Sequence, residues 1–167
     1  ALLVQGQPHG VSRAFFGPTA ETLPRGEGYL GVYGLVLPFV QVGVTDRLMI
    51  GVGSPLPLLV VGDFGSGLPY LVTAKARLFR DARTTVSAGV DQLGQTGEGG
   101  AGYLYLVGTR RVEGGTVSVG GGCLYATGDD GRACAPLVTL NAIGRVSGRV
   151  AVVTEVSETI GARHAED

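Results

Sequence analysis

The sequence of 167 residues has no tryptophan, one methionine, two cysteines, two histidines and a single lysine. Charged residues make up 16% of the chain, against about 25% in typical soluble domains. Thirteen basic and fourteen acidic side chains give a net charge of −1, which predicts no nucleic-acid partner. The apolar fraction of 44% argues against intrinsic disorder. We expect one domain over 1–167, with an N-terminal extension over 1–10 and a polar C-terminal tail over 159–167.

The scarcity of histidine limits the chemistry that the chain can perform. His9 and His164 lie near opposite ends, where chains are often frayed, so no Ser-His-Asp site is expected. No GxSxG nucleophile motif and no Walker A motif occur. Segments 26–31 and 97–102 match GxGxxG, but neither lies between a strand and a helix, so we interpret them as loop glycines. The sequence predicts a protein that is not an enzyme and holds no cofactor.

The two cysteines, Cys123 and Cys134, are separated by ten residues. This spacing differs from the CxxC pair of zinc sites, and no histidine lies nearby, so no metal is expected. A disulfide is favoured, which requires an oxidising compartment, and two unpaired thiols are the alternative. The acidic turn at 128–131 lacks the spaced oxygen ligands of a calcium loop.

Glycine is abundant, with 30 residues, about 18% of the chain against roughly 7% in ordinary proteins. Apolar and polar residues alternate with period two in several segments, which is typical of β-strands. Residues 28–45 carry no charge and are long enough for a transmembrane helix, but four glycines and a proline favour a strand. Nine strands are expected, at 11–16, 29–44, 48–55, 69–80, 84–94, 101–112, 116–126, 136–146 and 149–158.

Tight breaks alternate with looser connections between these strands. The tight breaks fall at 45–47, 81–83, 113–115 and 147–148, and the looser connections at 17–27, 56–68, 96–100 and 127–135. Short turns that alternate with longer loops are typical of outer-membrane barrels.

The polar face of the strands carries small side chains, because glycine, serine and threonine recur on it. A soluble barrel encloses its apolar face, whereas a membrane barrel turns that face to lipid. Small polar side chains and the single lysine favour the membrane order. We therefore expect an all-β fold, an antiparallel up-and-down meander that closes into a transmembrane-type barrel of 8–10 strands. The residues that test this orientation are Val32, Val40, Val72 and Leu140, which should point outward.

Charged residues on the polar face would lie in the lumen of such a barrel. They are Lys75, Arg77, Asp91, Arg145 and Glu155. We interpret them as a paired network that fills a closed lumen, because an unpaired buried charge is costly and so few strands leave little bore. The selectivity lining of a pore is the alternative.

Two features depart from a typical membrane barrel. Aromatic residues make up only 7% of the chain, so an aromatic girdle would rest mainly on tyrosines. These are Tyr70, Tyr103, Tyr105 and Tyr125. Nine strands is an odd number, whereas single-chain bacterial barrels have even numbers. Either one strand is missed, or the chain is a fragment, or the barrel closes differently.

Segments 15–55 and 137–155 resemble a family of uncharacterised bacterial outer-membrane β-barrel proteins. In that family a Gly-Pro-Thr-Ala loop leads through a Lys/Arg-Gly-Glu-Gly-Tyr segment into a long strand, and a Gly-Val-Thr-Asp turn follows. The matching residues here are 17–20, 25–29 and 43–46. The resemblance implies a location in the bacterial outer membrane, contact with the lipid bilayer and no catalytic residues.

The expected function is that of a non-enzymatic outer-membrane β-barrel protein with a structural or narrow pore-like role. Two alternatives stay open. A soluble secreted or periplasmic barrel would bind an apolar small molecule inside. A β-rich subunit of a larger cell-envelope assembly would pack its apolar face on other protein chains instead of lipid.

Overall fold

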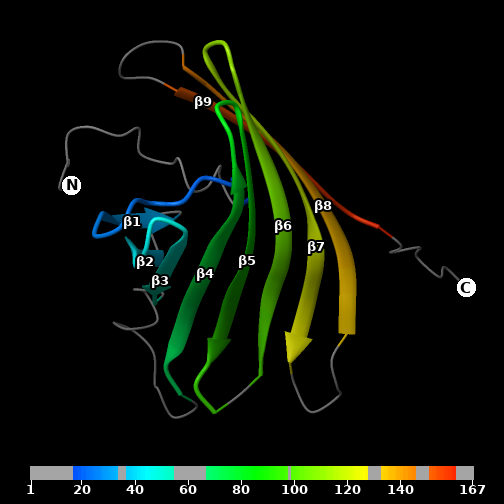
Figure 1. Cartoon of the computed structure of the whole chain (residues 1–167). Helices are drawn as coiled ribbons and strands as arrows, with labels where there is room; N and C mark the ends of the chain where they lie inside the picture. Colours follow the sequence, from blue (N-terminus) through cyan, green and yellow to red (C-terminus); the bar gives the residue numbers. More distant parts are fainter. Residues whose placement is uncertain are drawn as a thin grey trace, which may run out of the picture.

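The computed structural model of the chain describes residues 17–33, 37–54, 67–97, 99–127, 133–145 and 151–160. They form one nine-stranded antiparallel sheet in which each strand pairs with the next along the chain (Figure 1). The strands are β1 Gly28–Tyr33, β2 Leu37–Gly43, β3 Leu48–Gly53, β4 Pro69–Arg80, β5 Thr84–Gln95, β6 Gly100–Val112, β7 Gly115–Thr127, β8 Ala133–Arg145 and β9 Ala151–Thr159. The described residues contain no helix that could cross a membrane. The predicted all-β antiparallel meander is confirmed.

The sheet has a long-stranded part and a short-stranded part. Strands β4–β8 have 12 or 13 residues each, whereas β1–β3 have six or seven. In Figure 1 the long strands run side by side along one curved surface, and the short strands form a separate group next to β4. The bounds of β4–β8 agree with the sequence prediction to within three residues at each end.

The predicted single strand over 29–44 is wrong, because this segment forms two antiparallel strands, β1 and β2. Tyr33 pairs with Leu37, so three residues connect the strands. An odd connection keeps paired residues at the same parity, and paired residues lie on the same face of a sheet. The alternation therefore continues unbroken through the hairpin and does not distinguish it from one long strand.

The predicted closure into a barrel is not seen in the described part of the chain. There, β1 and β9 are the two edges of the sheet and do not pair with each other. Alternation predicts which face of a strand is apolar, but whether the first and last strands meet depends on the curvature of the whole sheet. The predicted strand at 11–16, the turn at 147–148, the extension over 1–10 and most of the tail over 159–167 lie outside the described residues.

Burial alternates along the strands, and the buried side of the sheet is the polar one. Its buried polar residues are Gln41, Thr73, Lys75, Thr85, Ser87, Thr109, Ser118, Thr139 and Asn141. We call this side the inner face and the opposite side the outer face. On the outer face Val32, Val40, Val72 and Leu140 are 54%, 44%, 45% and 49% exposed, as predicted. The strand register joins the outer residues into uncharged rows, such as Val42, Ile50, Ala74, Val90, Leu104 and Cys123.

Several glycines face an aromatic ring on the next strand. Gly89 lies directly opposite Tyr105, and a Cβ added at the glycine would collide with the tyrosine ring. Gly31 lies opposite Phe39, whose Cε1 and Cζ atoms would lie 2.7 Å from an added Cβ. Each ring thus lies over the backbone of the neighbouring strand, so part of the high glycine content makes room on a curved sheet.

Candidate functional site

The strand register aligns polar side chains in a row across the inner face. Thr85, Thr109, Ser118, Asn141 and Glu155, from β5 to β9, are register partners in turn. The first four are at most 3% exposed, and the hydroxyls of Thr109 and Ser118 are 2.8 Å apart. Because a buried polar group without a hydrogen bond is destabilising, such a row requires polar partners above it.

Residues 17–22, which we call the strap, provide these partners. All six are buried, and they cross the inner face from β9 toward β4. At the β9 end, the backbone N–H of Gly17 donates to Oε1 of Glu155 at 2.8 Å. On β8, Nδ2 of Asn141 donates to the carbonyl oxygen of Pro18 at 3.2 Å.

The middle of the strap is held by β5 and β6. The backbone N–H of Ala20 donates to Oγ1 of Thr109 at 2.7 Å, and Oγ of Ser87 donates to the carbonyl oxygen of Ala20 at 2.5 Å. The Ala20 side chain is fully buried in an apolar cluster with Tyr103, Tyr105 and Val107. A small side chain and two backbone hydrogen bonds thus fix the strap at its centre.

Lys75, the single lysine of the chain, lies at the β4 end of the strap and is 3% exposed. Its Nζ atom donates to the carbonyl oxygens of Thr19 and Glu21 at 2.9 and 3.1 Å. A buried ammonium group requires such acceptors because it has lost its hydration shell. Lys75 therefore links β4 to the backbone of the strap.

Glu21 is the charged residue of the strap, and its side chain is 6% exposed. Its Oε1 atom accepts hydrogen bonds from Nε and Nη2 of Arg111 on β6 at 3.2 and 2.9 Å. The Arg111 side chain is 46% exposed, so this ion pair lies between the buried strap and solvent.

Two buried polar atoms, Oγ1 of Thr22 in the strap and Oδ1 of Asn141 on β8, have no hydrogen-bond partner among the described residues. The side chain of Tyr103 on β6 interacts with Thr139 on β8, so the inner face also carries polar contacts that do not involve the strap.

The charged residues predicted for the lumen share the inner face where their side chains are described. Lys75 and Glu155 hold the strap toward its two ends. Asp91 on β5 pairs with Thr73 on β4, and Arg77 on β4 pairs with Ser87 on β5. Both charged residues are half-buried. The side chain of Arg145 lies outside the described residues.

Residues 17–27 contain no strand, as the predicted loose connection requires, but the prediction did not include the burial of residues 17–22 across the inner face. Arg111 and Glu21 were also absent from the predicted site, because alternation assigns roles to strand residues and says nothing about a segment that crosses them. One signal was present: residues 17–22 are small or moderately sized and carry a single charge, whereas exposed loops are usually richer in charge.

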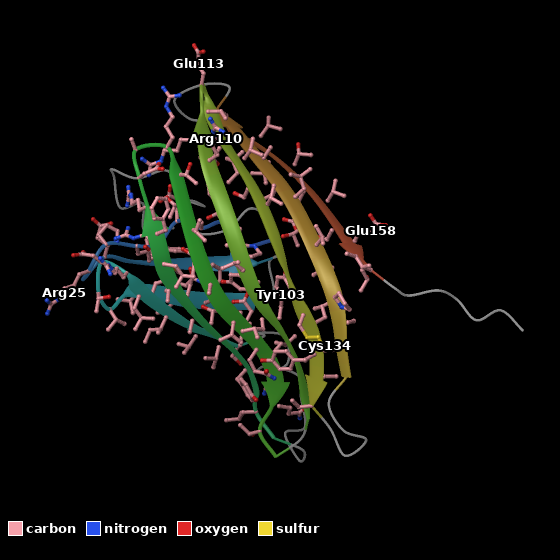
Figure 2. All side chains as sticks on the ribbon, turned by 45° about the vertical axis from the view of Figure 1, so that its right-hand side comes forward. Arg25, Tyr103, Arg110, Glu113, Cys134 and Glu158 are labelled. Carbon is pink, nitrogen blue, oxygen red and sulfur yellow. A yellow bond between two sulfur atoms is a disulfide. The ribbon has the colours of Figure 1, made fainter. Side chains whose placement is uncertain are left out.

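Cys123 and Cys134 form a disulfide between β7 and β8, as predicted (Figure 2). Cys123 and Tyr125 lie on the outer face of β7, because they alternate in the same way as the exposed Val119. Cys134 pairs with Tyr125, so it lies on the outer face of β8. Among the tyrosines expected in a girdle, Tyr70 and Tyr125 have this outward parity and lie at the same end of the sheet. Tyr103 and Tyr105 instead lie on the inner face, because they share the parity of the buried Val107.

No three His, Cys, Asp or Glu residues in the described ranges are grouped so that they could hold a metal ion. No family model, no curated protein and no solved structure matches the chain at a significant level. Functional inference therefore rests on the two faces of the sheet and on the strap.

Proposed function

We propose that this chain is a non-enzymatic β-barrel protein of the bacterial outer membrane, with its outer face against lipid and its interior filled by the strap. The observation that carries the proposal is the reversal of faces. Leu104, Leu106 and Val119 are more than half exposed, while Lys75 and Asn141 are buried. Because complete burial of a leucine or valine is worth about 1.5–3 kcal/mol, an outer face of this kind favours an apolar cover.

Strand length supports the same proposal. A strand of 12 or 13 residues is about 40 Å long, and at a tilt of about 45° it covers about 28 Å along the membrane normal. This matches the hydrocarbon core of a bilayer, about 30 Å thick.

The ends of the outer face also suit a membrane. Tyr70 and Tyr125 lie toward one end of the long strands, and Phe79, which is 53% exposed, lies toward the other. Arg110 and Glu113 lie at the same end as Phe79: Arg110 is close to the end of β6, and Glu113 follows the last residue of that strand (Figure 2). Aromatic side chains followed by charged ones are typical of the membrane–water interface.

The strap favours a structural role over an open pore. Gly17 to Thr22 occupy the middle of the inner face and are buried against five of its strands. The polar lining and the strap also give no support to the alternative of an apolar small molecule bound inside.

A second candidate, a subunit of a larger envelope assembly, is favoured by the two sheet edges. Lipid requires that every backbone N–H and C=O group of an edge strand is hydrogen-bonded. In the described residues β1 and β9 each pair on one side only. A strand from another envelope protein would satisfy these edges, as would closure within a single barrel.

Membrane extraction tests the proposal. In a bacterium with an outer membrane, the protein should stay in salt-washed and alkali-washed membranes until detergent is added, and it should migrate heat-modifiably on a gel. Release by salt alone would contradict the proposal. Stable folding of the isolated chain in detergent would favour a single barrel, and unfolding after removal of co-purifying chains would favour the assembly.

A pair of substitutions on one strand sharpens the test. Leu106→Arg, near the middle of β6, should reduce insertion into lipid vesicles by about 2–4 kcal/mol, because the charge would lie near the bilayer centre. Val112→Arg, at the end of β6 and with similar exposure, should cost only about 0–1 kcal/mol. Equal and small effects of both would indicate that water covers the outer face.

A further inference from the structure

The inner face uses its polar side chains to bind the main chain of the strap. Glu155 and Thr109 accept hydrogen bonds from backbone N–H groups of the strap. Lys75, Ser87 and Asn141 donate to its backbone carbonyls. These contacts involve peptide groups, which every polypeptide has, and they come from five different strands.

The inner face also selects side chains of the strap by size, since Pro18 and Thr19 are fully buried. At Ala20 a larger side chain would collide with the cluster of Tyr103, Tyr105 and Val107, because the residue is fully buried. At Gly17 an added Cβ would lie 3.2 Å from Nδ2 of Asn141, which leaves little room. The next requirement is an acidic residue directly after the alanine, where Arg111 pairs with Glu21.

We propose that the inner face is a binding site for an extended peptide in which a small residue is followed by an acidic one, and that the strap is its resident occupant. The inner face binds backbone groups at most positions, so a second chain fits as the strap does if its side chains are no larger than those of the strap and an acidic residue follows the small one. The inference is independent of the outer-membrane proposal, because none of these contacts involves the outer face.

The concentration at which a free peptide competes follows from the linkage of the strap to the sheet. A segment in the same chain has an effective concentration of about millimolar at its site. A peptide of equal affinity must therefore exceed about 1 mM, and about 10 mM displaces most of the strap.

Hydrogen exchange of the full chain tests the proposal. Amides of 17–22 should be protected, and about 10 mM of a capped peptide with the sequence of 17–23 should remove this protection while β5–β8 stay protected. A control peptide with arginine in place of the alanine should compete at least tenfold more weakly. Unchanged protection of 17–22, or equal competition by the two peptides, would overturn the proposal.

A chain variant provides a second readout. Ala20→Arg weakens the resident strap, so an isotope-labelled wild-type peptide should bind this variant at a concentration at least tenfold lower than it needs for the wild-type chain. Ala82→Arg, in an exposed turn, should bind the peptide like the wild type. A folded Ala20→Arg chain that binds no peptide contradicts the proposal, and if this variant does not fold, the exchange experiment on the wild-type chain decides.

Discussion

The long strands β4–β8 and the short strands β1–β3 both expose aliphatic side chains on the outer face, but they differ in length. Exposed aliphatic side chains cover the outer face of both parts, for example Leu106 on β6 and Val32 on β1. A strand of six or seven residues covers only about 15 Å at a tilt of about 45°, roughly half of a bilayer core. The comparison shows that alternation determines which face is apolar, whereas length determines what thickness of medium that face can cross.

The two parts also differ in what they hold. Lys75, Ser87 and Thr109 of the long part bind the strap itself. The short part binds the residues that follow it, since the N–H of Gly26 donates to the carbonyl oxygen of Gly43 at 2.8 Å. The long part therefore fixes the filling of the inner face, and the short part fixes the direction in which the chain leaves it.

The largest expected effect comes from placing arginine on the outer face of each part. Leu106 and Val32 are 53% and 54% exposed, so an arginine at either position would change the stability by a similar amount if only water covered the outer face. We expect Leu106→Arg to destabilise the protein in lipid vesicles by about 2–4 kcal/mol and Val32→Arg by about 0–1 kcal/mol. Leu106 lies near the middle of β6, whereas Val32 pairs with Pro38 at the level where β4 begins. Urea unfolding in vesicles measures both. Equal costs would refute the proposed difference in depth.

The second effect concerns the glycines of the long part. Gly89→Ala should destabilise the sheet by about 1–3 kcal/mol, because the added Cβ collides with the Tyr105 ring and would lie 2.8 Å from the carbonyl oxygen of Ala74. Gly121→Ala is the matched control, since its Cβ would approach no atom closer than 3.9 Å. That change should be neutral or stabilising by about 0.4–1 kcal/mol. Equal destabilisation of both variants would mean that glycine flexibility, rather than space for the ring, matters.

The third effect tests how firmly the long part holds the strap. Lys75→Met keeps most of the side-chain volume but removes the hydrogen bonds to the carbonyls of Thr19 and Glu21. We expect a loss of about 1.5–3 kcal/mol, typical of hydrogen bonds to charged groups, and faster proteolysis within 17–22. Arg80→Met, at the exposed end of the same strand, should stay within about 0.5 kcal/mol of the wild type. Unchanged proteolysis in Lys75→Met would show that other contacts hold the strap.

The sequence predicts the long part well because each of its strands carries its own alternating pattern. The alternation predicts one strand over 69–80, and β4 has the same bounds. The outward orientation of Val72 and Leu140 and the pairing of Cys123 with Cys134 also followed from local patterns.

The sequence predicts the short part and the strap poorly, for different physical reasons. Paired residues of β1 and β2 are both odd-numbered or both even-numbered, so the alternating pattern does not show where one strand ends and the next begins. The strap is held by contacts such as Gly17 with Glu155, which are 138 positions apart in the chain. Such contacts depend on the register of all the intervening strands, which no local pattern contains.

The smallest effect lies in the tight turn that joins β4 to β5. The carboxylate of Asp81 accepts hydrogen bonds from the backbone N–H groups of Arg83 and Thr84 at 2.7 and 2.6 Å. These bonds lower the pKa of Asp81 below its ordinary value of 3.8, the bond from Arg83 contributing most.

A lowered pKa means that the folded state favours the charged carboxylate, so the stabilisation is present above pH 3.8 and is lost as the pH falls through the folded-state pKa. Asp81→Ala should therefore be slightly less stable than the wild type at neutral pH, and the difference should shrink as the pH falls below 3.8. Denaturant unfolding of both proteins from neutral pH to below pH 3.8 measures the difference, with Glu113→Ala as the control in the turn between β6 and β7. A difference that stays constant with pH would indicate that Asp81 acts through the shape of the turn rather than through its charge.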